Sequence, residues 1–412
     1  MDWKPRVIEP GELDAMIDLS STVFGAGFVA PENYRKEVST VVEDDRCFVV
    51  DDGEHTIAGT GAAYTFRMTM PGGAAVPVCA VTEVGVLPTH RRQGVLTSIM
   101  GALFDQAVEL GEPLAALTAS EGSIYRRYGF GVGTRYHKVL VDTVRSAELV
   151  EVADPGRLRL VSEDQAVPLL PIAWEGQFQR SPGEMSRNDA WWEMLAIDPE
   201  DDRGGASARY LVVHEDTDGE PDGFVSYRLK EGGAPDGYFF ELSVDDLAAA
   251  DETVEAVLLR YLMDVDLVRQ VRWRSAPVDL SLRWRLVEPR AVRVIEERDH
   301  LWVRPLDVAA CLSSRTYAAE GGGVLEVVDT RRPDVGGRFA LDAGVEGADC
   351  ARADVSPDVT LGVAELGALL LGGVTWATLQ RAGVVEEHTS GAVDRLDALF
   401  RPTRAPHCTT GF

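Results

Sequence analysis

The sequence predicts an α/β (α+β) protein built from several domains, and three observations support that expectation. The chain has 412 residues, which is more than one hydrophobic core usually holds. Its apolar fraction of 45% is ordinary for a folded protein. Strand patterns alternate with helical patterns along the chain, which is typical of layered α/β structures.

The first region, residues 1–144, carries the clearest elements. Turn signals such as Pro71-Gly72-Gly73 separate its apolar runs. From Val95 onward, apolar residues recur at helical spacing. The expected strands are Arg46–Val50, Ile57–Thr69, Pro77–Val86 and Leu114–Thr118, and a short helix is expected over Ile124–Tyr128.

Two further regions follow, residues 145–298 and 299–412. A polar, proline-containing linker over Glu148–Pro155 opens the second region. Its element order resembles that of the first region, with helices expected at Ala190–Leu195 and Thr253–Leu267 and a hairpin from Tyr210–Val213 and Gly223–Leu229. In the third region we expect strands at Val324–Val328 and Gly337–Leu341, and helices at Val363–Leu371 and Val393–Phe400.

The formal net charge of −27 restricts the partners of this protein. Nucleic-acid binding needs a basic face, so we expect no nucleic-acid partner. An acidic surface attracts cationic substrates and speeds their arrival. Solubility alone explains the same charge, and the sequence leaves these two interpretations open.

The five cysteines and the chain ends indicate a cytoplasmic protein without metal. The cysteines are scattered, odd in number and without zinc-ligand spacing, so we expect neither a disulfide framework nor a metal site. The first residues lack the apolar run of a signal peptide. The longest apolar stretch, near Leu361–Val374, is too short to span a membrane, and no membrane partner is expected.

The stretch from Val81 to Leu96 carries the strongest chemical signal. A strand ends at Val86-Leu87-Pro88, a basic loop containing Arg91, Arg92 and Gly94 follows, and a helix then begins. The first amides of a helix lack internal partners and carry the positive end of its dipole, so they suit a pyrophosphate. The loop matches neither a Walker motif nor a Rossmann fingerprint.

This loop resembles that of the Gcn5-related N-acetyltransferases (GNAT), whose pattern is Arg/Gln-x-x-Gly-x-Gly/Ala. Leu96 stands where many members have a small residue. The resemblance implies that acetyl-CoA binds to Arg91, Arg92, Gly94, Val95 and Leu96. It also implies that the preceding strand splays from its neighbour, so that exposed amides of Val84 and Val86 pair with the pantetheine arm.

The segment Ala119–Phe130 matches a second GNAT feature, a tyrosine before a Gly-Phe pair. In that family the tyrosine protonates the departing coenzyme A thiolate. Tyr125 aligns with it, and a phenol is matched in basicity to a thiolate. Tyr128 is the competing candidate. Ser120, in the same segment, is expected to contact the coenzyme.

Three segments together resemble the Eis (enhanced intracellular survival) acetyltransferases: PTHRRQG, ASEGSIYRRYGFG and LDALFRPTRAPHCTTGF. The resemblance covers essentially the whole chain. It implies a catalytic GNAT domain over residues 1–144, a degenerate GNAT-like domain over 145–298, and a sterol-carrier-protein-like domain over 299–412. It further implies acetylation of cationic amines, notably aminoglycosides at several positions, acetylation of protein lysines by some members, and assembly into hexamers.

Two carboxylates compete for the role of catalytic base. In the Eis family the α-carboxylate of an aromatic last residue, here Phe412, returns to the active site. Glu83 is the alternative, because it lies on the splayed strand from which some GNAT enzymes draw a base. The sequence does not decide between them.

The acceptor site is less well defined by the sequence. Phe24, Phe28 and Tyr34 form a possible aromatic wall that attracts cations, or they are ordinary core residues. The chain lacks an acid in the loop around Gly25 and has Gly411 before its last residue, where an acid occurs in some members. A non-catalytic protein that binds acyl-CoA or lipid through the third domain is the alternative function.

Overall fold

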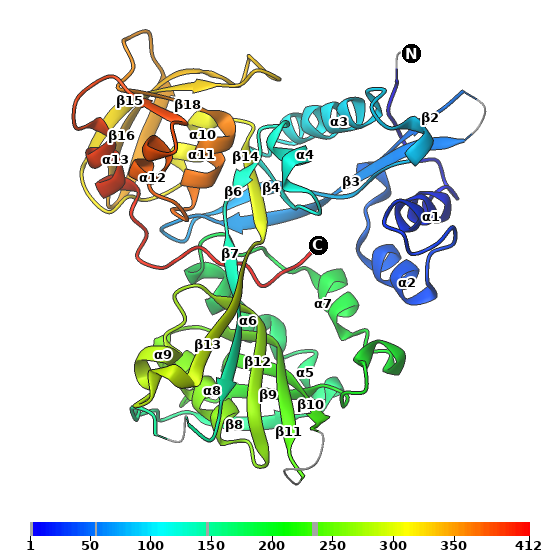
Figure 1. Ribbon diagram of the computed structural model, residues 1–412, viewed down its shortest axis with the longest axis vertical. Coiled ribbons are helices and arrows are strands. Elements are labelled where there is room, and N and C mark those ends of the chain that lie inside the picture. Colours follow the sequence, from blue (N-terminus) through cyan, green and yellow to red (C-terminus); the bar gives the residue numbers. More distant parts are fainter. Residues whose placement is uncertain (1–2, 54–55, 146–147, 233–237) are drawn as a thin grey trace.

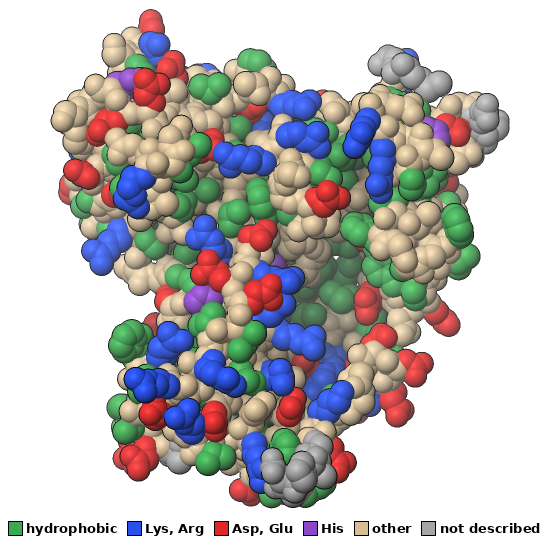
Figure 2. Space-filling model, viewed as in Figure 1, with side chains coloured by type: hydrophobic (Ala, Val, Ile, Leu, Met, Phe, Trp, Pro, Cys, Tyr) green, Lys and Arg blue, Asp and Glu red, His purple; other side chains and the backbone are tan. Residues whose placement is uncertain are grey.

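The computed structural model describes residues 3–53, 56–145, 148–232 and 238–412. Three units are visible in Figure 1: the first lies at the upper right, the second below it, and the third at the upper left. The chain end runs between them and stops between the first and second units, where the surface in Figure 2 is hollowed.

The first unit is a seven-stranded sheet with helices on both faces. The order of its strands is β1-β2-β3-β4-β5-β14-β6. Their bounds are β1 (Arg6–Val7), β2 (Cys47–Asp51), β3 (Ile57–Thr69), β4 (Ala75–Val86), β5 (Leu114–Thr118), β14 (Leu301–Pro305) and β6 (Gly131–Val132). The helices are α1 (Leu13–Val23), α2 (Glu32–Val41), α3 (Val95–Glu109) and α4 (Gly122–Arg126), with a 3-10 turn at Pro88–His90.

Small residues on β3 let α3 lie close to the sheet. A Cβ at Gly59 would approach Val95 Cγ1 to 2.5 Å, and one at Gly61 would approach Ile99 Cγ2 to 2.6 Å. The buried side of α3, which includes Val95, Ile99 and Leu103, therefore packs directly on this strand. This close packing fixes where the helix starts, and the start of this helix is the feature that matters for function.

The second unit repeats the arrangement of the first. Its sheet has the order β8-β9-β10-β11-β12-β7-β13. The strands are β8 (Arg157–Val161), β9 (Tyr210–Glu215), β10 (Pro221–Glu231), β11 (Phe240–Ala249), β12 (Val268–Pro277), β7 (Arg135–Asp142) and β13 (Val292–Asp299). The helices are α5 (Glu163–Ala166), α6 (Leu170–Arg180), α7 (Asp189–Ala196), α8 (Glu252–Asp264) and α9 (Leu282–Arg285), with 3-10 turns at Glu200–Arg203 and Pro289–Ala291.

The two sheets exchange strands. β7 precedes the expected boundary at residue 144, yet it lies in the second sheet between β12 and β13. β14 follows the expected boundary at residue 298, yet it pairs with β5 and β6 in the first sheet. The domain boundaries at residues 144 and 298 stay a prediction. The exchange of β7 and β14 ties the two units together through backbone hydrogen bonds.

The third unit is a five-stranded sheet with the order β17-β16-β15-β18-β19. Its strands are β15 (Gly321–Val328), β16 (Gly337–Gly344), β17 (Gly347–Arg352), β18 (Val359–Gly362) and β19 (Val385–Glu387), and its helices are α10 (Val308–Ser313), α11 (Val363–Leu370), α12 (Trp376–Arg381) and α13 (Ala392–Phe400). Its core is continuous with that of the first sheet, since Phe66 and Leu301 share a cluster with Leu370 and Phe400.

The start of α8 distinguishes the second unit from the first. α8 follows β11 as α3 follows β4, but the carboxylate of Asp251 accepts the first amides of α8, from Thr253 at 2.7 Å and Val254 at 2.9 Å. A carboxylate therefore already occupies the anion site of this helix. The start of α3, by contrast, has no side-chain cap.

Replacing Asp251 with alanine is expected to destabilise the protein by about 1 kcal/mol, because two amides lose their acceptor. Urea denaturation measures this loss as a lower midpoint. Asp251→Asn is the control, because it keeps a capping oxygen. Equal midpoints for the alanine and asparagine variants would show that the cap contributes nothing.

Candidate functional site

A gap opens between β4 and β5 in the first sheet. The two strands pair in parallel only where Val78–Ala80 lies beside Leu114–Ala116, while β4 continues to Val86. The amide of Leu87 donates to the carbonyl of Ala58 on β3. Since amides alternate in direction along a strand, that of Val86 points to the opposite, open edge.

A β-bulge lies on β4 beside this gap. Two steps along β3, from Thr60 to Ala62, oppose three steps along β4, from Gly85 to Thr82. Glu83 takes up the extra length with a φ of 49°, a left-handed conformation that is uncommon for a side-chain-bearing residue. Val84 follows it, so both residues lie where the strand is locally distorted.

The carboxylate of Glu83 is 9% exposed and held by Tyr34 of α2. The Tyr34 hydroxyl donates to both carboxylate oxygens, at 2.8 and 2.9 Å. Burial, together with the charge of Glu83, raises the pKa of Tyr34 well above its ordinary value. Tyr34 is therefore a neutral donor that orients Glu83.

The loop before α3 presents unpaired amides and two cations. Arg92 and Gly94 both have positive φ, 62° and 97°, and no side chain caps the helix at Gly94. Arg91 and Arg92 are exposed. The indole of Trp3 donates to the carbonyl of Gln93 at 2.8 Å and fixes the loop. The arrangement suits an anionic group such as a pyrophosphate.

The first two residues of α3 are less exposed than the loop before them. Val95 is buried in the core and Leu96 is partly buried, so what they offer a ligand is backbone amides. Ser120 is exposed in the turn between β5 and α4. It follows the end of β5 at Thr118, and β5 is the strand that borders the gap.

Tyr125 and Tyr128 have different surroundings. Tyr125 is 7% exposed and packs edge-on against Phe130, and its phenol has no hydrogen-bond partner that the described residues supply. Burial, with smaller effects from Glu121 and Tyr128, raises the pKa of Tyr125 to about 12. The Tyr128 hydroxyl is instead paired with Thr97 at 3.0 Å. Among the described residues, the hydroxyl of Tyr128 is thus paired with another side chain and that of Tyr125 is not.

The last residue lies against the first sheet. The Thr118 hydroxyl, at the end of β5, donates to an oxygen of Phe412 at 2.6 Å. The Phe412 ring packs against Tyr64 and Phe66 of β3, which also contact Trp191 of α7. The chain end therefore lies beside the strand pair that splays apart.

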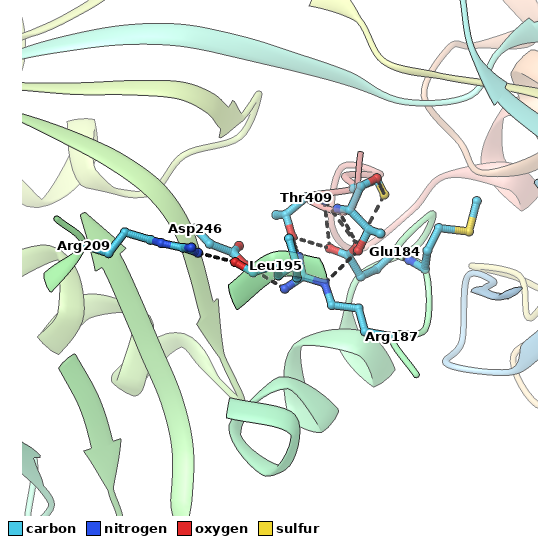
Figure 3. A network of polar contacts seen from close by, with 9 residues as sticks. Glu184, Arg187, Leu195, Arg209, Asp246 and Thr409 are labelled. Atoms are coloured by element: carbon cyan, nitrogen blue, oxygen red, sulfur yellow. Dashed lines mark hydrogen bonds and ion pairs between the residues drawn. The ribbon is translucent and has the colours of Figure 1, made fainter. Parts of the chain in front are cut away.

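The residues before Phe412 are held by the second unit, as Figure 3 shows. The fully buried carboxylate of Glu184 accepts the amides of Thr409, at 3.0 Å, and Thr410, at 3.3 Å. Arg187 donates to both threonine hydroxyls at 3.0 Å. We call these contacts the tail clamp.

Sequence reasoning missed Thr118, Tyr64, Trp191 and both acidic and basic members of the tail clamp. Glu184 and Arg187 lie more than 220 positions from the threonines they bind. No local pattern marks them, because an isolated Glu-x-x-Arg spacing is common on loops and helices. Only the packing of the units brings them to the chain end.

The suggested aromatic wall is not assembled in this structure. Phe28 is 85% exposed and Phe24 is 59% exposed, both in the segment that joins α1 and α2, whereas Tyr34 is directed to Glu83. Within the described ranges, no ring contact joins the three. Neither phenylalanine is a core residue, so a role in acceptor binding stays a prediction.

Two kinds of site find no support. Across residues 3–53, 56–145, 148–232 and 238–412, no group of three or more His, Cys, Asp or Glu side chains is placed to hold a metal ion. Nor does any helix in the described part of the chain have the length and apolar character needed to cross a membrane.

Comparison with protein families assigns each unit. Models of the GNAT acetyltransferase domain match residues 4–133 and 183–304, and a sterol carrier protein domain model matches residues 308–409. The chain is 37% identical to an uncharacterized N-acetyltransferase of Streptomyces coelicolor over the full length of both. It is 32% identical to the N-acetyltransferase Eis of Mycobacterium tuberculosis, covering 90% of each chain.

Solved structures agree with these assignments. The crystal structure of Eis1 from Mycobacterium abscessus has a TM-score of 0.86 at 30% identity, with all of both chains covered. A GCN5-related N-acetyltransferase from Anabaena variabilis, at 19% identity, has a TM-score of 0.83 over both whole chains and shares the fold.

Proposed function

Since this chain belongs to the Eis family of GNAT N-acetyltransferases and is therefore an acetyltransferase, we propose that it moves acetyl from acetyl-CoA to primary amines of cationic acceptors. The observation that carries the proposal is the meeting of Phe412 with Thr118 at the β4–β5 gap. One region then holds the carboxylate of Phe412, the open edge of β4 at which a thioester would lie, and the phenol of Tyr125.

Acetyl-CoA fits the residues present. Its pyrophosphate would meet the amides of Gly94, Val95 and Leu96 with Arg91 and Arg92 beside them. The open edge of β4 offers the Val86 amide to the pantetheine arm or the thioester carbonyl. Val84, next to the bulge, and exposed Ser120 complete the expected coenzyme contacts.

The reaction follows from these positions. The neutral amine attacks the thioester carbonyl, the N–C bond forms and the C–S bond breaks. The carboxylate of Phe412 takes the proton that the amine loses, or positions the amine, while Tyr125 donates its proton to the departing thiolate. Glu83 is the second candidate for the base, because it is the other carboxylate beside the gap.

The acceptor class rests on charge. A net charge of −27 attracts polycations such as aminoglycosides, for which acetylation at several positions is part of the proposal, and protein lysines are a second acceptor. Exposed Phe24 and Phe28 offer faces for cation–π contact at the edge of α1 and α2.

Assembly and location are also part of the proposal. Exposed Trp284, Val287 and Ile295 supply apolar surface on α9, on the segment after it and on β13, which supports a homo-oligomer, a hexamer by family likeness. The five cysteines are free thiols, which supports a reducing cytoplasm. Light scattering of the purified protein tests the assembly.

The double variant Arg91→Ala/Arg92→Ala is expected to raise the KM for acetyl-CoA roughly tenfold or more, because charge-assisted contacts to phosphate are lost. Thiol release from acetyl-CoA with an aminoglycoside as acceptor measures both this KM and the activity itself. Arg290→Ala/Arg293→Ala is the matched control, since it removes two exposed cations from the second unit. Equal KM values in both double variants would place the coenzyme elsewhere.

A further inference from the structure

A separate cavity of about 470 Å³ lies within the second unit. Its walls come from α5–α7, β9–β11 and the tail residues Thr409–Gly411. The first unit, with the coenzyme loop and Tyr125, contributes none of the lining residues. The tail clamp forms one side of the cavity, and Figure 3 shows Arg187, Asp246 and Thr409 meeting there.

The cavity lies at the second unit's counterpart of the Glu83 bulge. On β11, Asp245 is an extra residue, because Ser226 pairs with Asp246 while Tyr227 pairs with Val244. Both units thus place a carboxylate at the same distortion of the same strand. The second unit, however, has the start of α8 capped by Asp251, so two of the first amides of this helix are not free for a coenzyme.

The cations in the cavity wall are already paired. Arg187 donates to Thr409, Thr410 and Asp246 Oδ2, the last at 2.7 Å. Arg209 donates to the carbonyls of Leu195 and Ile197. All three nitrogens of Arg187 and both terminal nitrogens of Arg209 thus already donate to acceptors on the protein.

Two polar atoms are left over: a carboxylate oxygen, which accepts, and a serine hydroxyl, which can accept or donate. Asp246 Oδ1 and Ser226 Oγ are buried and have no hydrogen-bond partner within the part of the chain that the structure describes. Ser226 is 5% exposed and lines the cavity. Since buried polar atoms are nearly always paired in proteins, these two mark where a donor belongs.

The remaining walls are apolar. Trp192 and Phe224 pack edge-on against each other, with 6.4 Å between their ring centroids, and Leu211 also lines the cavity. Acidic lining residues outnumber the arginines, with Glu163, Asp189, Glu193, Asp245 and Asp246 against Arg187 and Arg209. The matching ligand has an apolar body and one positively charged donor.

We propose that this cavity binds a small amine with an apolar body, whose ammonium group donates to Asp246 Oδ1 and Ser226 Oγ. The site is distinct from the acetyl-transfer site and does not depend on turnover. Because Thr409–Gly411 form one wall, the bound amine contacts the segment that ends at Phe412.

Calorimetric titration without acetyl-CoA tests the proposal, with N,N-dimethyl-2-phenylethylamine as the probe. This tertiary amine carries a proton to donate and forms no stable acetyl product. It is expected to bind at least about tenfold more tightly than neutral 2-phenylethanol. Asp246→Asn, which is nearly isosteric, and Ser226→Leu, which fills the cavity, are each expected to weaken binding about tenfold or more.

Glu83→Gln is the matched carboxylate control in the first unit and is expected to leave the affinity for the probe unchanged. Should Glu83→Gln weaken binding while Asp246→Asn does not, the amine sits at the acetyl-transfer site and the proposal is wrong. Equal affinity for amine and alcohol also overturns it. If Ser226→Leu does not fold, the affinity of Asp246→Asn for the probe decides whether the proposal holds. The Tyr125→Phe protein is expected to bind the probe normally. Loss of probe binding and loss of acetyl transfer can therefore be told apart.

Discussion

Replacing Tyr125 with phenylalanine is expected to lower kcat by roughly 10²–10⁴-fold, while the affinity for acetyl-CoA holds. The variant keeps the ring that packs against Phe130 and loses only the hydroxyl. A group that acts in the transition state affects kcat and kcat/KM together, without changing coenzyme binding. Steady-state thiol release and calorimetry with the coenzyme measure the two quantities.

Tyr128→Phe is the natural control for this experiment, because it removes a hydroxyl of the same kind three residues along the chain. Its phenol is already paired with Thr97, so a small effect is expected. A large loss of kcat in Tyr128→Phe with near-normal Tyr125→Phe would transfer the role of acid to Tyr128.

The raised pKa of Tyr125 also sets the pH dependence. With a pKa of about 12, the phenol keeps its proton at every pH below that value. Loss of the acid form therefore lowers the rate only as the pH rises through about 12. A fall in kcat near neutral pH that disappears in Tyr125→Phe would contradict this assignment.

Adding a short tag after Phe412 is expected to lower kcat about a hundredfold or more, because the carboxylate moves away while the ring stays. The ring contacts with Tyr64 and Phe66, and the tail clamp at Glu184, hold the rest of the segment in place. Coenzyme affinity and the unfolding midpoint are expected to match those of the untagged protein, which separates catalysis from folding.

Glu83→Gln decides between the two carboxylates. It preserves the size of the side chain and an oxygen that accepts from Tyr34. If the tagged protein keeps full activity while Glu83→Gln has none, the base is Glu83 and the contact between Phe412 and Thr118 is structural. Loss of activity on tagging with an active Glu83→Gln protein supports the terminal carboxylate.

Several elements follow directly from the sequence. The expected strands Ile57–Thr69 and Leu114–Thr118 match β3 and β5 residue for residue, and the helix expected from Val95 is α3. The expected helix Thr253–Leu267 ends earlier, at Asp264, because Val265 is already extended, with a φ of −62° and a ψ of 121°. The expected helix Ile124–Tyr128 lies at Gly122–Arg126.

The sequence by itself determined the anion loop before α3, the candidate Tyr125 and the three-part order of the chain. These are local features, since a strand, a turn and a helix start are encoded by residues within one or two turns of each other. Only the tertiary structure decided the strand exchange, the Tyr34–Glu83 contact, and the hold of Glu184 and Arg187 on the tail. The tail contacts join residues more than 220 positions apart and form only when whole units pack against one another, whereas Tyr34 and Glu83 lie 49 positions apart and meet when α2 folds against β4.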